Sequence, residues 1–212
     1  MTDHIDGRRR RFEHRRGEIV AAATAHVLEH GVGSLSLRTL ARSVGISHAT
    51  LLHHFSNREA LVAEVVDAAI ARALSLPDLE ADNRPDPLRD IWERARTPHG
   101  RQHVRLFVEL TGISMYSETA VRAAVARSMG ERAQALAAGV ARAGCPADEA
   151  AAMSAWVLSA LRGLMAELLV TGDEEHADAA FEDLHRTVMD RAAGWTAQAR
   201  HERPAGPPIP RT

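Results

Sequence analysis

The sequence predicts an all-α protein in which a small N-terminal domain, built on a unit of three helices, precedes a larger helical domain. Aromatic residues make up only 4% of the 212 residues, whereas alanine and leucine are abundant. This composition favours helices over strands. Apolar residues recur at spacings of three and four, the period of a helix with one buried face, and no segment shows the alternation of a half-buried strand.

Local signals define the elements of the N-terminal domain. Four consecutive arginines in a polar segment predict a basic flexible arm over residues 1–12. An apolar helical stripe begins near Glu13 and stops at Gly31, and Gly45 separates two short serine-capped helices. The helices expected after the arm span residues 13–30, 36–43, 47–54 and 57–74, within a domain of residues 13–74.

The second domain is expected over residues 75–203. Prolines at positions 77, 85 and 87 mark its beginning, and the proline-rich residues 204–212 read as a disordered tail. Helical periodicity resumes after the prolines and is broken at glycine-containing turns. The predicted helices span residues 87–96, 101–116, 118–143, 147–171 and 177–200.

Charge is distributed unevenly along the chain. Residues 1–60 contain nine arginines and six acidic residues, a net charge of +3, and the remaining residues carry −5. The N-terminal part is therefore the part suited to an anionic partner. Cys145 is the single cysteine, which excludes an intramolecular disulfide. We find no signal peptide and no apolar run of the roughly 18 residues that span a membrane, and expect a soluble, cytoplasmic protein without a membrane partner.

The most informative segment runs from Ser36 to Leu61. Two short helices meet at Gly45, where glycine relieves the steric cost of a left-handed turn. Ala41 is small enough to let the helices approach closely, and apolar residues on both helices can form a shared core. This pattern predicts a helix-turn-helix, which presents its second helix to the major groove of DNA.

The same segment resembles the TetR family of bacterial transcriptional regulators. The resemblance rests on Ala41, on Gly45-Ile46-Ser47, on Ala49 to Phe55 and on Asn57 to Leu61. It extends over residues 13–74 and implies a homodimeric regulator, usually a repressor, that leaves a palindromic operator when a small molecule binds. The chain departs from the family pattern where Leu52 replaces a frequent tyrosine, Ala49 a glycine and Arg58 a lysine.

Candidate DNA contacts follow from the helix-turn-helix. Two side chains, Arg38 and His48, could reach base edges, whereas the methyl group of Ala49 could touch a thymine methyl. The remaining candidates, which would position the phosphate backbone, are Ser47, Thr50, His53, His54 and Arg58.

The second domain contains two further sets of candidates, each of which could equally be ordinary core. Methionine, aromatic and polar residues at helical spacing could line an apolar effector pocket, whose presence the resemblance implies. These are Trp92, His103, Phe107, Thr111, Met115, Tyr116, Met129 and Trp156. Small residues of one helix and apolar residues of the next could form a four-helix dimer interface. These are Ala155, Ser159, Gly163, Ala166, Phe181, Leu184 and Val188.

Other classes of protein fit the sequence less well. It contains no glycine-rich phosphate loop and no nucleophile motif, so we expect neither catalytic residues, nor a cofactor, nor an enzyme. The pairs His26/His30 and His99/His103 each share a helix face, but further metal ligands are missing, so no metal site is expected. A helical adaptor that has lost DNA binding is a third alternative, which the intact turn and the basic N-terminal third argue against.

Overall fold

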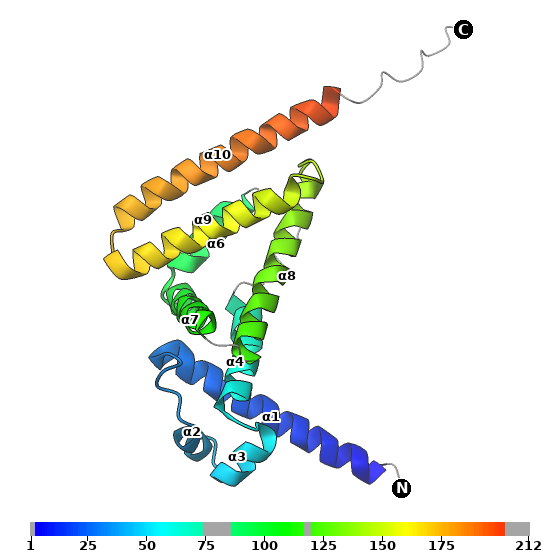
Figure 1. Ribbon diagram of the computed structural model, residues 1–212, viewed down its shortest axis with the longest axis vertical. Coiled ribbons are helices and arrows are strands. Elements are labelled where there is room, and N and C mark those ends of the chain that lie inside the picture. The colour runs from blue at the N-terminus through cyan, green and yellow to red at the C-terminus, as the bar shows by residue number, and fades with distance from the viewer. Residues whose placement is uncertain (1–2, 74–85, 117–119, 202–212) are drawn as a thin grey trace, which may run out of the picture. The chain divides into compact units, whose positions relative to one another are not determined.

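The computed structural model describes residues 3–73, 86–116 and 120–201, and all regular structure in these ranges is α-helical (Figure 1). The structure therefore confirms the predicted all-α fold class. The helices are α1 (Asp3–His30), α2 (Leu37–Ser43), α3 (His48–His54), α4 (Arg58–Ala73), α6 (Pro87–Arg96), α7 (Pro98–Met115), α8 (Ala120–Arg142), α9 (Ala150–Thr171) and α10 (Glu174–His201).

The first helix is longer than predicted. It begins at Asp3 and not near Glu13, so the flexible arm expected over residues 1–12 is wrong from Asp3 onward. Arginine is among the better helix formers, and a run of four arginines therefore continues a helix as readily as it forms a flexible tail.

The remaining predicted helices are confirmed, with boundaries that differ by at most three residues. The largest differences lie at the starts of α7, α9 and α10. In α7, Pro98 occupies the first helical position, and the Thr97 hydroxyl accepts a hydrogen bond from the Gly100 amide at 3.0 Å. This combination of cap and proline starts the helix three residues before the predicted position.

Contacts divide the chain into two compact units. Unit 1 comprises the described residues of 1–77 and 93–131, and unit 2 comprises those of 78–92 and 132–212. The division falls within α6 and within α8, so α7 and the first half of α8 pack with the N-terminal helices. Residues 93–131 were assigned from the sequence to the second domain; the domain boundary at residue 75 stays a prediction.

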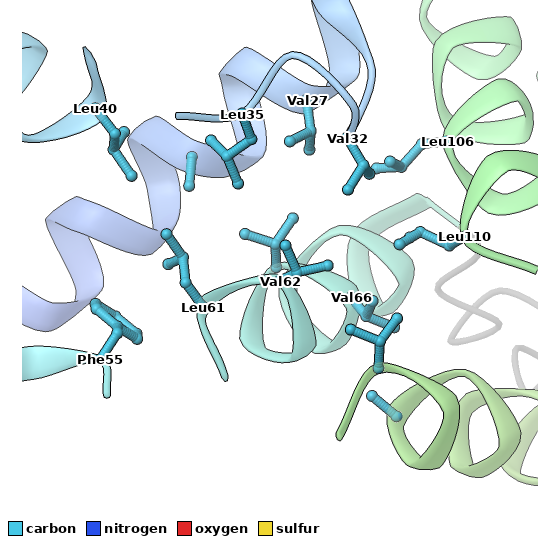
Figure 2. Packing of buried hydrophobic residues seen from close by; sticks show 14 of the residues in the cluster. Val27, Val32, Leu35, Leu40, Phe55, Leu61, Val62, Val66, Leu106 and Leu110 are labelled. Atoms are coloured by element: carbon cyan, nitrogen blue, oxygen red, sulfur yellow. The ribbon is translucent and has the colours of Figure 1, made fainter. Parts of the chain in front are cut away.

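The core of unit 1 forms where α1, α4 and α7 meet. Figure 2 shows Val62 and Val66 of α4 between Val27 of α1 and Leu110 of α7. Burying one such side chain stabilises a fold by roughly 1.5–3 kcal/mol. The helix-turn-helix joins this core through residues that are less than 5% exposed, namely Leu35, Leu40, Ala41, Leu51 and Phe55.

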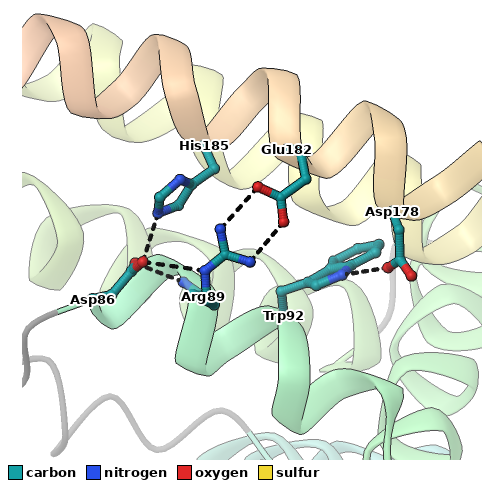
Figure 3. A network of polar contacts seen from close by, with 6 residues as sticks. All are labelled: Asp86, Arg89, Trp92, Asp178, Glu182 and His185. Atoms are coloured by element: carbon teal, nitrogen blue, oxygen red, sulfur yellow. Dashed lines mark hydrogen bonds and ion pairs between the residues drawn. The ribbon is translucent and has the colours of Figure 1, made fainter.

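Unit 2 contains the antiparallel pair α9 and α10, and a polar network fastens α6 to α10 (Figure 3). The Arg89 guanidinium donates to both carboxylate oxygens of Glu182 at 2.6 and 2.8 Å. The same contact lowers the pKa of Glu182. Beside it, the Trp92 indole stacks on Phe181 with ring centroids 4.7 Å apart and donates to Asp178 at 3.0 Å.

Helix α9 is strongly apolar, although only part of it is buried within the chain. By length and composition it is the one described helix that could cross a membrane, and 33% of its most apolar stretch is buried within the chain. The sequence had indicated no such run, because Arg162 and Glu167 interrupt it. A core helix of a soluble protein meets the same criterion, so this property alone assigns no membrane role.

Candidate DNA-binding surface

The turn between α2 and α3 has the hydrogen bonds typical of a helix that ends at a glycine. Gly45 has a φ of +70°, which only glycine adopts without strain. The Ile46 amide donates back to the Ala41 carbonyl at 2.9 Å, and the Gly45 amide to that of Arg42 at 3.2 Å. This closing pattern turns the chain sharply and sets the angle at which α3 leaves α2.

Ser47 caps α3 as the sequence predicts. Its hydroxyl accepts a hydrogen bond from the Thr50 amide at 3.0 Å and lies 2.8 Å from the Thr50 hydroxyl. A serine cap stabilises a helix by about 1 kcal/mol. The helix has only seven residues, so its position depends mainly on Leu51 and Phe55, which are 0% and 1% exposed.

Six of the eight predicted DNA contacts are exposed around this short helix. None of them is needed in the core, so their polar groups are accessible to a partner. Their exposure agrees with a DNA-facing surface, and their individual contacts stay predictions. These residues are Arg38, Ser47, His48, Ala49, Thr50 and His53.

His54 differs from the other predicted contacts of α3 because it is buried, and its contact with DNA stays a prediction. Its side chain is 8% exposed, and its ring stacks on Phe12 with centroids 4.3 Å apart. Burial lowers the pKa of His54, and the nearby charges of His53, Arg16 and Arg15 lower this pKa further. The ring therefore joins the end of α3 to α1 in its neutral form.

Arg58 also has a structural role that the sequence did not reveal. It is half-buried, and its Nε donates to the Leu35 carbonyl at 3.0 Å while Nη2 donates to the Val32 carbonyl. These bonds hold the turn between α1 and α2 against the start of α4. Two nitrogens of the guanidinium are therefore engaged within the chain, and the phosphate contact of Arg58 stays a prediction.

Arg16 positions the end of α3, a role that sequence reasoning missed. Its guanidinium pairs with the Glu64 carboxylate, donates to the His54 carbonyl, and lies over the Phe55 ring at 4.3 Å from the centroid. Arg16 precedes Ile19 and Ala23 by three and seven residues, which places it on the buried face of α1. That spacing is the signal that could have identified it.

We expect the free energy of unfolding to fall when the pH drops below about 6.5, the ordinary histidine pKa. Because the folded pKa of His54 is lowered, the unfolded chain binds more protons in this range, and stability is lost as pH falls. The pKa of His103 is likewise lowered, by burial above all, so it contributes with the same sign. Thermal unfolding between about pH 7.5 and pH 5.5 measures the effect.

The control for this prediction uses two histidines of the same helix. His54→Phe removes the titrating group while keeping a ring on Phe12, so it should reduce the loss of stability on acidification. His48→Gln changes an exposed histidine and should leave that loss unaltered. Equal pH dependence in wild type and His54→Phe would show that His54 does not carry the effect.

The predicted pocket residues do not lie in one compact unit. Trp92 and Trp156 belong to unit 2, and the other six belong to unit 1. His103 and Phe107 are each 8% exposed, whereas Met115 and Tyr116 at the end of α7 are 72% and 94% exposed. Met115 and Tyr116 are thus surface residues of unit 1, and the effector pocket stays a prediction.

The predicted dimer residues separate into two groups. On α9, Ala155, Ser159 and Gly163 are exposed and Ala166 is half-buried, so this stripe of small residues is open to a partner. The three residues predicted on α10 are buried within unit 2, at 0–9% exposure, so they serve the core of their own chain, and their part in a dimer interface stays a prediction. An apolar stripe on a helix can pack against the core of its own chain as well as against a second copy of the chain. The three are Phe181, Leu184 and Val188.

Comparisons with known proteins agree with this geometry. Residues 19–65 match the family model described as bacterial regulatory proteins, tetR family. A TetR-family transcriptional regulator from Cytophaga hutchinsonii is 15% identical and superposes with a TM-score of 0.71, over 87% of this chain and 96% of that one. A transcriptional regulator from Rhodococcus is 18% identical, with a TM-score of 0.67 over 82% and 96% of the two chains.

A third solved structure was determined with a small molecule bound. The multidrug binding protein EbrR, complexed with proflavin, is 24% identical and has a TM-score of 0.61, over 81% of this chain and 98% of that one. No curated protein sequence matches the chain significantly. At these identities the structural likenesses establish the fold, while the family model identifies the N-terminal segment.

Proposed function

Because the chain belongs to the TetR family through its N-terminal helix-turn-helix, we propose that it represses transcription by binding a palindromic operator as a homodimer. Family membership makes the chain a DNA-binding regulator and not an enzyme; repression, the palindrome and the dimer are the proposal. The observation that carries it is the exposed face of α3, held on a buried core and capped by Ser47. We also propose a cytoplasmic location.

We propose two roles for the exposed residues. Arg38 and His48 read base edges, and Thr50 and His53 hold phosphates on either side of the groove. The distinction matters because base contacts carry sequence information, whereas phosphate contacts fix the register of the protein on the duplex.

Selection from a random duplex library tests this proposal. The chain should enrich a palindromic site, and its affinity should fall steeply between about 50 and 200 mM salt as bound counterions are released. Arg38→Ala and His48→Ala should reduce the discrimination between bases at particular positions by about 1–3 kcal/mol. His53→Ala should instead lower the affinity for all sequences by a similar factor. Failure to enrich any site, or affinity that does not change with salt, would contradict DNA recognition.

The homodimer is supported by the open stripe on α9. Ala155, Ser159 and Gly163 lie four residues apart on its exposed side, and close helix packing needs such small residues. Trp156 and Val170 on the same helix are 40% and 87% exposed, which adds apolar surface for a partner to cover. An exposed apolar face on a long helix is typical of an interface.

We further propose an apolar small-molecule effector that lowers operator affinity. The EbrR structure with proflavin supports this for a protein of the same fold, and the methionine and aromatic residues of this chain suit an apolar ligand. By linkage, operator DNA must lower effector affinity by the same factor as effector lowers DNA affinity. A thermal-shift panel of apolar compounds that includes proflavin, followed by competition on the selected duplex, would reject the coupling if compounds bind without changing DNA affinity.

A further inference from the structure

The turn that leads into the helix-turn-helix is bound by a carboxylate from α7. Glu109 accepts hydrogen bonds from the amides of Val32 and Gly33, at 2.9 Å to Oε2 and 3.0 Å to Oε1. These two amides follow the end of α1 in the turn between α1 and α2, where Gly31 has a φ of +79°. Hydrogen bonds to a charged acceptor are about twice as strong as those between neutral groups.

The same turn is held from its other side by α4. Arg58 donates to the carbonyls of Val32 and Leu35, so the amide of Val32 is bound from α7 and its carbonyl from α4. The Val32 side chain is 1% exposed and lies beside Leu106 of α7 in Figure 2. Through its backbone and side chain, Val32 thus connects the end of α1 to α4 and to α7.

The carboxylate of Glu109 lies close to the backbone of Gly31. A Cβ placed on Gly31 would lie 3.0 Å from Glu109 Oε2, closer than ordinary contacts. Four residues after the turn's Gly33, the chain enters α2 at Leu37. A displacement of α7 that breaks the two carboxylate bonds therefore leaves the segment from which α2 begins bound on one side only, by Arg58 of α4.

We propose that Glu109 is the positioning residue through which the packing of α7 and the DNA affinity of α2 and α3 are coupled. This inference rests on the proposed DNA-binding function and adds the route by which a change outside the helix-turn-helix reaches it. Coupling between two sites is reciprocal, so DNA bound at α3 must also stabilise the contact that Glu109 makes.

Hydrogen exchange with and without DNA measures this coupling directly. The probe is a duplex selected by the full-length chain, and a scrambled duplex of equal length is its control. In wild type, the selected duplex should slow amide exchange in α7 around Glu109 by at least about 5-fold, the lower end of typical coupling between sites. Glu109→Gln, which replaces one acceptor oxygen with an NH₂ group that repels a backbone amide, should remove this protection while α3 stays protected.

Comparing exchange with and without DNA distinguishes coupling from a merely structural role of Glu109. If Glu109 only stabilised the fold, Glu109→Gln would accelerate exchange in α7 equally with and without DNA, and the protection factor due to DNA would persist. Such persistence would overturn the proposal, as would a wild type in which DNA protects α3 but leaves α7 unchanged. Absence of protection at α3 itself would instead mean that the proposed DNA-binding function has failed.

Two further variants keep the test decisive. Glu109→Asp retains the charge but is one methylene too short to reach both amides, so it should lose the protection of α7 even if Glu109→Gln folds poorly. Glu131→Gln changes an exposed glutamate of α8 in the same unit and should behave as wild type. If Glu109→Asp and Glu131→Gln both retained the DNA-induced protection of α7, Glu109 would not be the coupling residue.

Discussion

Arg16→Ala is expected to lower affinity for the selected operator at least about tenfold, a loss of 1.4 kcal/mol or more. The substitution removes the donor to the His54 carbonyl, the partner of Glu64 and the cation over the Phe55 ring. The contacts with His54 and Phe55 hold the C-terminal end of α3, and the pair with Glu64 joins α1 to α4, so the exposed residues of α3 lose part of the support that fixes their position. The free energy of unfolding should fall by about 1–3 kcal/mol, in the lower part of this range because Arg16 and Glu64 are each about a third exposed.

Arg15→Ala is the matched control for this prediction. Arg15 lies next in the chain, has the same charge, and pairs with Glu18 on the exposed side of α1 at 2.8 Å. Fluorescence anisotropy on the selected duplex and urea unfolding should be measured for both variants. Equal losses of DNA affinity in Arg15→Ala and Arg16→Ala would mean that charge alone matters and that Arg16 does not position α3.

Gly163→Leu is expected to convert a dimer into a folded monomer and thereby weaken operator binding severely. Within the chain, a Cβ at Gly163 meets nothing within 4 Å, so the added side chain causes no internal clash. Leucine also favours a helix over glycine by roughly 0.8–1 kcal/mol, and the isolated chain should not be destabilised. Against a second copy of α9, however, the new side chain would hold the two helices apart.

Sedimentation velocity on the wild type and on Gly163→Leu decides this prediction. Gly130→Leu is the control, because Gly130 is an exposed helical glycine of α8 with equally open surroundings. The control should remain dimeric and the Gly163 variant should not. A monomeric wild type, or a Gly163→Leu protein that still forms dimers, would reject the proposed role of the α9 stripe.

The sequence predicted the elements of the helix-turn-helix well because their signals are local. Gly45 and Ser47 determine the turn and the start of α3 through bonds to residues at most five positions away. The helix boundaries of the second half follow in the same way from prolines, glycines and caps. Local signals therefore predicted most of the fold before any tertiary contact was known.

The roles that the sequence did not reveal belong to side chains whose partners are distant in the chain. Arg58 matches the pattern of a phosphate contact, but the carbonyls that engage it lie 23 and 26 residues earlier in the chain. His54 adjoins exposed His53, and its ring stacks on Phe12, which lies 42 residues earlier in the chain. Periodicity identified the apolar face of α10 without revealing whether Phe181 meets its own chain or another.

The shortness of α3 has a consequence for genetics. At seven residues, α3 is far shorter than the roughly 12–15 residues at which an isolated helix is marginally stable. It is therefore formed only while the core beneath it is intact. Substitutions at Leu51 or Phe55, or further away at Ile19, would remove operator recognition without touching a base or phosphate. For the proposed repressor, a screen for constitutive expression should therefore recover mostly temperature-sensitive alleles at buried positions, with the wild-type phenotype restored by growth at low temperature.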